Sequence, residues 1–395
     1  MTDDRFDRDR LVASAMDATG LSDATLLGED GWQDGLDRLL DDLDHEARLN
    51  DLGREIVLGE LAGYLGTRLK LHQWRRDHPA VAAQPVERPI VIVGQPRTGT
   101  TILYDLLAQD PARRAPLTWE VDAPVPPPEP ATYDTDPRIA ESQATLDMVD
   151  LVLPGFTDFH PLGAQLAQEC VRITGGEFKS MIFPTQYRVP NYNRWLLHEA
   201  DLASAYRYHR TFLQHLQSAQ PPQAWLLKSP AHLWHLDALV GEYPDVTVIQ
   251  THRDPLKVIA SVSALVAHLR RLASDDTSVA DAASTYSEDI LLGLERGIAA
   301  RDAGTIDPTR EIDVHFTEFV ADPLGIIKGI YDRLDQELTP EAEQRMRAFL
   351  DAHPGDGGGG GSRYAWADTG LDPDEIRERA RPYQERFGVV SEPVR

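Results

Sequence analysis

The sequence predicts an α/β protein in which a central parallel sheet is flanked by helices and preceded by an N-terminal helical extension. Three observations support this fold class. Short apolar runs of strand length recur along the chain, helical segments separate them, and the first run leads through a glycine turn into an amphipathic helix. Because strands that alternate with helices are joined by crossover connections, we expect them to pair in parallel and to be buried.

The first part of the chain shows a helical pattern. Apolar residues recur at helical spacing between about residues 21 and 74, as in the segment from Leu36 to Leu43. Prolines at positions 85 and 89 then interrupt the chain. We therefore expect an N-terminal helical extension over residues 1–85 and an α/β domain over residues 86–395. The extension either packs against the rest of the chain, which is the favoured interpretation, or contributes to a homo-oligomer contact.

Four apolar runs are expected to form strands. The first is Ile90–Val93, and its amphipathic helix continues from Ile102 to Asp110; the later runs lie at 225–227, 246–249 and 312–316. Between the first two strands lies an insertion of about residues 116–222, which begins with a proline-rich linker. Near the end, a run of five glycines predicts a C-terminal loop at about residues 355–370.

Composition excludes several classes of function. The net charge of −25 argues against nucleic acid and against an anionic membrane surface as partners. Cys170 is the single cysteine, so the chain can form neither an intrachain disulfide nor a thiolate metal cluster. The charged first residues do not resemble a secretory signal, and no stretch is apolar enough for a membrane span. A cytoplasmic location is therefore expected.

The turn after the first strand has the spacing of a P-loop. The segment from Gly94 to Thr101 reads GQPRTGTT, in which backbone N–H groups and the following helix N-terminus can bind an anion. This pattern makes the expected sheet P-loop NTPase-like. A P-loop NTPase needs lysine where this chain has Thr100, and no aspartate ends a strand as in a magnesium-binding NTPase. We therefore expect Arg97 to supply the cation and expect no obligatory metal.

The segment PIVIVGQPRTGTT resembles the 5′-phosphosulfate loop of sulfotransferases that depend on 3′-phosphoadenosine 5′-phosphosulfate (PAPS), in the bacterial branch related to tyrosylprotein sulfotransferases. The resemblance extends over about residues 89–388. It implies an enzyme that moves a sulfuryl group from PAPS to an acceptor hydroxyl and releases adenosine 3′,5′-bisphosphate (PAP). The expected loop residues for the donor are Arg97, Thr98, Gly99, Thr100 and Thr101.

A second phosphate site is expected where the third strand passes into a helix. Arg253 stands at the carboxyl end of that strand, where ligands bind in open α/β sheets. Ser261 follows eight residues later, and this spacing resembles the sulfotransferase motif that holds the 3′-phosphate of the donor. The alternative is that Arg253 pairs with a carboxylate and Ser261 is an ordinary helix residue. Arg363, after the glycine run, resembles the basic loop that closes over the nucleotide, or it is solvated.

Three residues are candidates for catalysis. Lys228 ends the second apolar run and resembles the family's lysine that stabilises the sulfuryl group and the bridging oxygen, unless it forms a structural ion pair. Glu120 matches the glutamate that serves as base in tyrosylprotein sulfotransferases, unless it is an ion-paired or surface residue. His160 is the rival base, although a lone histidine is more often structural. One departure is the segment 314–319, where relatives often carry Arg-Tyr.

Two other functions compete with sulfuryl transfer. One is a P-loop kinase or NTPase-like phosphotransferase, and the other is a nucleotide-binding protein whose active site is catalytically retired. Lys228, Glu120 and Arg253 occurring together argue against decay. The acceptor can be a small molecule, a lipid or a carbohydrate, and the insertion is the natural place for its pocket. The insertion's aromatic residues favour an apolar acceptor unless they belong to the core.

Overall fold

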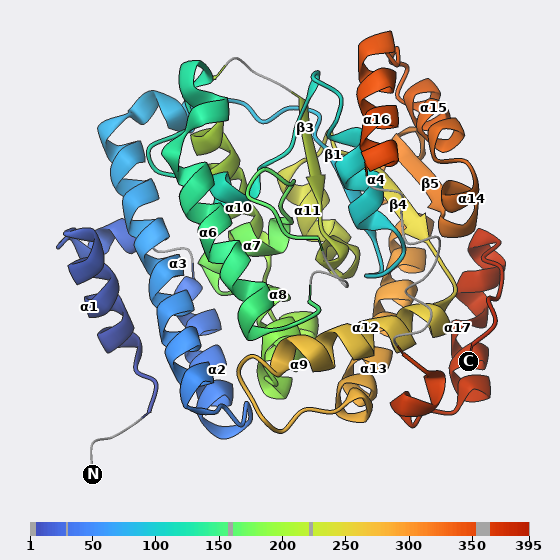
Figure 1. Cartoon of the computed structure of the whole chain (residues 1–395), viewed down its shortest axis with the longest axis horizontal. Coiled ribbons are helices and arrows are strands. Elements are labelled where there is room, and N and C mark those ends of the chain that lie inside the picture. Colours follow the sequence, from blue (N-terminus) through green and yellow to red (C-terminus); the bar gives the residue numbers. More distant parts are fainter. Residues whose placement is uncertain (1–4, 29–30, 157–160, 221–223, 353–363, 395) are drawn as a thin grey trace. The chain divides into compact units, whose positions relative to one another are not determined.

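The computed structural model of the chain (Figure 1) describes residues 5–28, 31–156, 161–220, 224–352 and 364–394. The chain folds into two compact units. The first consists of Met1–Val86, Pro116–Pro222 and His268–Thr277, and the second of Glu87–Ala115, Gln223–Ala267 and Ser278–Arg395. The insertion expected at about residues 116–222 thus belongs to the same unit as the N-terminal helices. The domain division at residue 85 stays a prediction.

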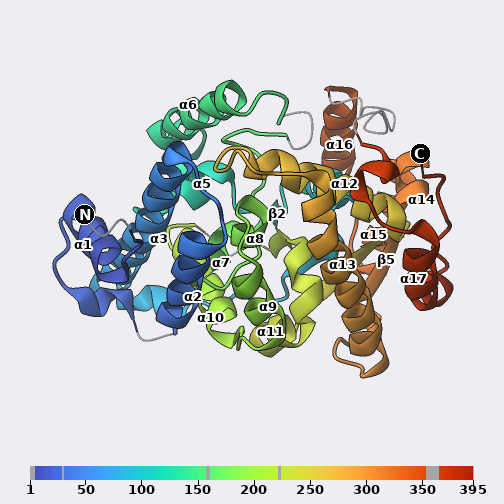
Figure 2. The same cartoon turned by 90° about the horizontal axis from the view of Figure 1, so that it is seen from below.

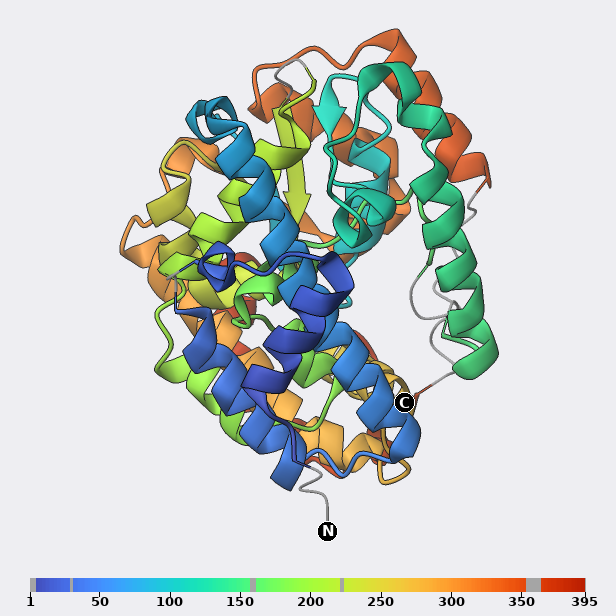
Figure 3. The ribbon, with the colours of Figure 1, turned by 90° about the vertical axis from the view of Figure 1, so that its left-hand side faces the viewer.

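The first unit is helical. Its helices are α1 (Arg8–Thr19), α2 (Trp32–His45), α3 (Asp51–Asp77), α5 (Thr118–Asp122), α6 (Pro137–Val152), α7 (Cys170–Thr174), α8 (Ile182–Gln186), α9 (Pro190–His198) and α10 (Ala203–Leu216). Side chains of Asp7 and Asn50 cap α1 and α3 by accepting hydrogen bonds from main-chain N–H groups. α1 lies along α3 (Figure 3), and the leucines predicted at helical spacing are buried on α2.

Five of the aromatic residues of the insertion form part of this unit's core: Phe178, Phe183, Tyr187, Tyr192 and Trp195. Phe178 and Phe183 are fully buried and stack with ring centroids 6.1 Å apart. Tyr192 meets Phe183 edge-on, and Trp195 packs on Tyr192. Such burial accounts for these side chains by packing alone. They therefore give no support to an apolar acceptor.

The second unit contains the predicted parallel sheet. Its strands are β1 (Ile90–Gly94), β2 (Arg113–Arg114), β3 (Ala224–Lys228), β4 (Thr247–His252) and β5 (Glu311–His315), in the order β2-β3-β1-β4-β5. Every neighbouring pair is parallel. The four apolar runs thus confirm the predicted α/β fold, in which β1 is central and fully buried. In the described part of the chain, the strand that was missed is β2, because its two arginines carry no apolar pattern.

Helices surround this sheet. They are α4 (Thr100–Leu107), α11 (Leu236–Glu242), α12 (Pro255–Arg270), α13 (Val279–Asp302), α14 (Phe316–Ala321), α15 (Pro323–Arg333), α16 (Pro340–Ala352) and α17 (Pro373–Phe387). The last turn of α12 belongs to the first unit. α14 and α15 follow β5 directly and pack beside it (Figure 2). Within the described part of the chain, the membrane-span criteria of length and apolar character are met by none of the helices.

The register of the sheet positions the candidate site. Ile92 of β1 is paired with Lys228 of β3, and Gly94 of β1 is paired with Thr251 of β4. The carboxyl ends of three adjacent strands therefore lie at one edge. The predicted phosphate loop leaves β1 at this edge, Lys228 ends β3, and Arg253 follows β4. A parallel sheet binds ligands at this edge.

Candidate active site

The loop between β1 and α4 depends on two glycines. Gly94 has φ +133°, and a Cβ there would lie 2.3 Å from Oγ1 of Thr251 and 2.7 Å from its carbonyl oxygen. Gly99 has φ +87° and is the N-cap of α4, where a Cβ would lie 2.8 Å from Cδ2 of Phe316. Only glycine tolerates both the left-handed backbone and this crowding. The loop is thereby held tightly, and the N-terminus of α4 at Thr100 and Thr101 is a site at which backbone N–H groups favour an anion.

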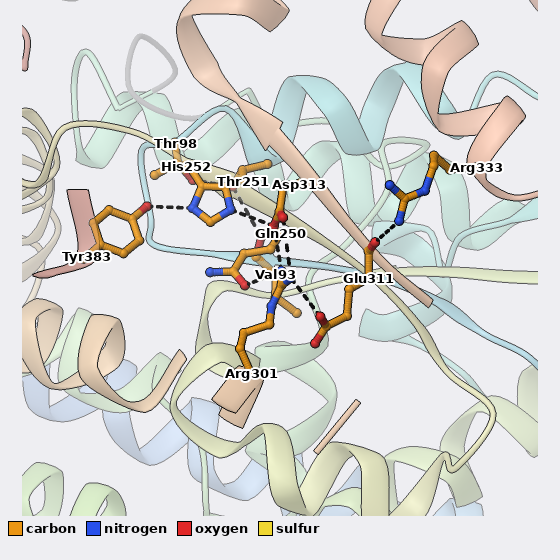
Figure 4. Close-up of polar contacts among 10 residues, drawn as sticks. All are labelled: Val93, Thr98, Gln250, Thr251, His252, Arg301, Glu311, Asp313, Arg333 and Tyr383. Carbon is orange, nitrogen blue, oxygen red and sulfur yellow. Dashed lines mark hydrogen bonds and ion pairs between the residues drawn. The ribbon is translucent and has the colours of Figure 1, made fainter. Parts of the chain in front are cut away.

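Thr98 anchors the loop to the sheet. Its hydroxyl donates to the carbonyl oxygen of Gln95 at 2.6 Å and lies 2.5 Å from Oγ1 of Thr251 on β4. Thr98 is buried, and Figure 4 shows it beside Thr251. The hydroxyl of Thr98 is thus used in contacts within the protein. A contact from Thr98 to the sulfuryl donor would therefore come from its main chain.

Arg97 connects the loop to both residues of the predicted second phosphate site. Its Nε donates to Oγ of Ser261 at 3.0 Å, and its carbonyl oxygen accepts a hydrogen bond from Nη1 of Arg253 at 3.0 Å. The residue adopts φ +68°, a left-handed conformation that turns side chain and carbonyl to these partners. Burial lowers the pKa of Arg97, Tyr364 opposes this shift, and the nearby cation of Arg253 adds to it. An anion between the two arginines would relieve their repulsion.

Arg253 lies on the ring of Phe316, with Cζ 3.9 Å from the ring centroid. Its Nε and Nη2 donate to the two carboxylate oxygens of Glu392, at 2.9 and 3.1 Å. The carboxylate partner that the sequence left open as an alternative is therefore present. Arg253 also contacts Arg97, and Arg97 in turn contacts Ser261. The interpretation as a phosphate site requires these residues to lie near one another. Phe316 and Glu392 were not identified from the sequence as site residues.

Asp254, the residue after Arg253, has the position of an N-cap and performs that role. Its Oδ1 accepts from the N–H of Leu256 and from Nη1 of Arg377, and its Oδ2 accepts from Nη2 of Arg377 and from the N–H of Glu392. Four hydrogen bonds use the acceptor capacity of a carboxylate. Asp254 therefore holds the C-terminal segment in place.

Among the described residues, no group of three or more His, Cys, Asp or Glu side chains is arranged to hold a metal ion.

Lys228 reaches the phosphate loop from the neighbouring strand. Its Nζ donates to Oγ1 of Thr101 at 3.2 Å and lies 5.7 Å from the ring centroid of Tyr104. The side chain is almost completely buried. The carboxyl end of β3 is fixed to β1 because the N–H of Ser229 donates to the carbonyl oxygen of Ile92. A buried ammonium group at the N-terminus of α4 adds positive charge where the loop would bind an anion.

A network of polar contacts that includes the buried His252 joins β4, β5 and α17 (Figure 4). His252 lies 2.9 Å from both Oδ1 of Asp313 and the hydroxyl of Tyr383, and Asp313 also accepts from Arg301. Burial lowers the pKa of His252, although Asp313 opposes this. Burial also favours the protonated acid at Asp313, but the hydrogen bonds from His252 and Arg301 outweigh it and lower that pKa to about 2. Neutral His252 therefore donates through Nε2 to Asp313 and accepts from Tyr383 at Nδ1.

The candidate base, Glu120, belongs to the first unit. It lies in the short helix α5, and its Oε2 accepts from the N–H of Leu117 at 2.8 Å. The side chain is fully buried. The surface alternative for Glu120 is therefore wrong, whereas its catalytic role stays a prediction. The other two candidates, His160 and Arg363, lie outside the described residues.

The comparisons with known proteins agree with this geometry. A family model described as "Sulfotransferase family" matches residues 89–340. Over 306 residues the chain is 27% identical to the omega-hydroxy-beta-dihydromenaquinone-9 sulfotransferase Stf3 of Mycobacterium bovis and of Mycobacterium tuberculosis, which covers 73% of this chain and 72% of each relative.

Two solved structures are similar along nearly the whole chain. Sulfotransferase STF9 from Mycobacterium avium has a TM-score of 0.87 and 32% identity, covering 99% of both chains. Sulfotransferase STF1 from Mycobacterium tuberculosis has a TM-score of 0.83 and 32% identity, covering 95% of this chain and 98% of that one. Since the family model spans well over half of the sequence and these structures share the fold, the chain belongs to the sulfotransferase family and is a sulfotransferase enzyme.

Proposed function

We propose that this sulfotransferase takes its sulfuryl group from PAPS and transfers it to the hydroxyl of an acceptor. The observation that carries the proposal is the group of cations at one edge of the sheet. These cations are Arg97, Lys228 and Arg253, which come from three different segments. Arg97 and Lys228 donate to the hydroxyl groups of Ser261 and Thr101, and Arg253 donates to the carbonyl oxygen of Arg97. In a chain with a net charge of −25, such a local group of cations favours a small polyanion.

The two ends of this group suit the two ends of the donor. Lys228, Thr101 and the N-terminus of α4 would hold the 5′-phosphosulfate, because the loop between β1 and α4 presents its N–H groups there. Arg253 and Ser261 would hold the 3′-phosphate, and Arg97 links them to the loop. ATP has no 3′-phosphate, so this second end would distinguish the two nucleotides.

With the donor held in this way, the proposed reaction is an in-line transfer of the sulfuryl group. The acceptor oxygen attacks sulfur in line, the new O–S bond forms, and the bond between sulfur and the phosphate oxygen breaks with release of PAP. Lys228 would stabilise the charge that develops on the leaving oxygen. The acceptor proton would pass to the carboxylate of Glu120, whose side chain is fully buried. His160 stays the alternative base.

The acceptor is proposed to be an alcohol on a largely apolar molecule. The support is the printed name of the Stf3 relatives, which specifies an omega-hydroxy group on a dihydromenaquinone. The buried aromatic residues of the insertion do not add to this support. A phenol and a carbohydrate hydroxyl are the competing acceptors.

The test offers radiolabelled PAPS and a panel of long-chain alcohols, phenols and sugars to the full-length protein, with and without excess EDTA. We expect label in an alcohol product and turnover that survives EDTA. Transfer from γ-labelled ATP that requires magnesium, with none from PAPS, would instead identify a phosphotransferase. Tight PAP binding without transfer to any acceptor would support a catalytically retired nucleotide-binding protein.

A further inference from the structure

The carboxylate of Glu392 occupies the side of Arg253 that a phosphate would use. Arg253 donates to it through Nε and Nη2, and its Nη1 donates to the carbonyl oxygen of Arg97. The two side chains are only 16% and 18% exposed, so water screens the pair weakly. A phosphate therefore cannot form a two-point contact through Nε and Nη2 until Glu392 moves away.

The backbone of Glu392 is fixed independently of its side chain. Its N–H donates to Oδ2 of Asp254 at 2.6 Å, and Arg377 holds that same carboxylate from α17. Upstream, the N–H of Val389 donates to the carbonyl oxygen of Gln384 at 2.9 Å, so the chain leaves α17 in a defined direction. These anchors keep the carboxylate at a high effective concentration beside Arg253. The contact with Arg253 can therefore break by a movement of the Glu392 side chain while its main chain stays anchored.

We propose that Glu392 sets the affinity for the donor nucleotide, as a carboxylate that stands in the 3′-phosphate position and that the nucleotide must displace. The inference rests on the proposed PAPS specificity of the same site. A phosphate can replace the carboxylate because it carries more charge and a third oxygen. The hydroxyl of Ser261, which accepts a hydrogen bond from Arg97, would donate to this third oxygen. A nucleotide without a 3′-phosphate gains nothing by displacing Glu392.

This difference makes the role of Glu392 measurable. Binding of PAP includes the cost of breaking the contact between Arg253 and Glu392, whereas binding of AMP leaves that contact intact. Removal of the carboxylate should therefore tighten PAP binding and leave AMP binding unchanged. Glu392 thus lowers the affinity for the spent donor and favours its release.

Calorimetric titration of the full-length chain with PAP and with AMP tests this inference. For Glu392→Gln we expect the Kd of PAP to fall about 10-fold, the effect of one charge-assisted contact, and the Kd of AMP to change less than about twofold. The matched control is Glu378→Gln, which removes the same charge from a Glu–Arg pair on the exposed face of α17. This control should bind both nucleotides like the wild type.

A second variant separates charge from contact. Glu392→Asp keeps the charge but is one methylene too short to reach Arg253 from the same backbone anchor, so it should also tighten PAP binding. An unchanged or weaker PAP affinity in both variants, while PAP still binds much better than AMP, would overturn the inference and leave the proposed donor intact. Equal affinities of PAP and AMP in the wild type and in Glu392→Gln would overturn the donor assignment itself.

Discussion

The two compact units place their buried charges in different ways. In the helical unit, Arg68 and Glu177 form a completely buried ion pair at 2.5 Å. In the sheet unit, Arg97 and Lys228 donate to the hydroxyls of Ser261 and Thr101. In the sheet unit, Arg253 is in addition paired with Glu392, at the edge of the sheet where the phosphate loop leaves β1. The buried pair of the helical unit is neutral and serves the fold, whereas the three cations at the sheet edge are the ones that we propose to bind the nucleotide.

Glu120 is the strongest test of whether the helical unit contributes chemistry as well as structure. Glu120→Gln should lower kcat/KM by about 10²–10⁴-fold for an aliphatic alcohol, the usual effect of losing a general base. The amide oxygen of glutamine can still accept from the N–H of Leu117, so the end of α5 should survive. For a phenol of low pKa the loss should be smaller, because phenolate is already present.

Steady-state assays of Glu120→Gln on both acceptors, with His160→Ala in parallel, decide this prediction. Activity near the wild type on both acceptors, together with an inactive His160→Ala, would assign the base to His160. If neither variant loses activity, the helical unit supplies no base and its polar groups serve the fold alone.

Lys228 tests the sheet unit in the same way. Lys228→Ala should lower turnover by about 10²–10³-fold on every acceptor, because the lysine is proposed to act on charge that develops during the reaction. PAP binding should weaken by a smaller factor. Turnover and the Kd of PAP are measured against Lys328→Ala, which removes a lysine from an exposed ion pair on α15. Equal losses in turnover and in PAP affinity would mean that Lys228 serves binding only.

Gly94→Ala tests whether the stability of the sheet unit depends on the tight geometry of the phosphate loop. Gly94→Ala places a methyl group against Thr251 at a positive φ, so we expect the free energy of unfolding to fall by about 2–4 kcal/mol. Gly329→Ala is the control, since nothing lies within 4 Å of the new Cβ in helix α15. It should raise stability by about 0.5–1 kcal/mol. A Gly94→Ala protein as stable as Gly329→Ala would show that the loop can relax.

The pH dependence of stability tests a buried histidine of the helical unit, His215. Burial lowers the pKa of His215 from 6.5 to about 4, although the hydrogen bond between its ring and the carbonyl oxygen of Pro124 opposes this shift. The unfolded chain therefore binds more protons below pH 6.5, and stability falls as the pH decreases towards 4. This histidine accounts for about 1–2 kcal/mol between pH 7 and pH 5.

Urea unfolding of the wild type and of His215→Gln at pH 7 and pH 5 checks this expectation. The variant should show a smaller loss of stability on acidification. An identical pH dependence would mean that the ring of His215 is protonated as easily in the folded chain as in the unfolded one.

The sequence predicted the parts of the site that depend on local pattern. The β1–loop–α4 segment combines an apolar run, two glycines and an amphipathic helix, and these are visible in consecutive residues. Arg253 followed from its place at a strand end. By contrast, Glu392 lies 139 residues from Arg253, and nothing in its neighbourhood marks it as a partner. The capping role of Glu120 was missed, since Leu117 before it is no typical N-cap.

The end of β4 sends three consecutive side chains to the C-terminal segment: His252 to Tyr383, Arg253 to Glu392 and Asp254 to Arg377. These contacts should leave a record in the evolution of relatives with the same segment. Positions 254 and 377 should change together, because loss of Arg377 would leave the buried carboxylate of Asp254 without its charged partner. Position 253 should be held fixed by the donor. Position 392 is then the one place in the set where natural variation can adjust how long the spent nucleotide stays bound.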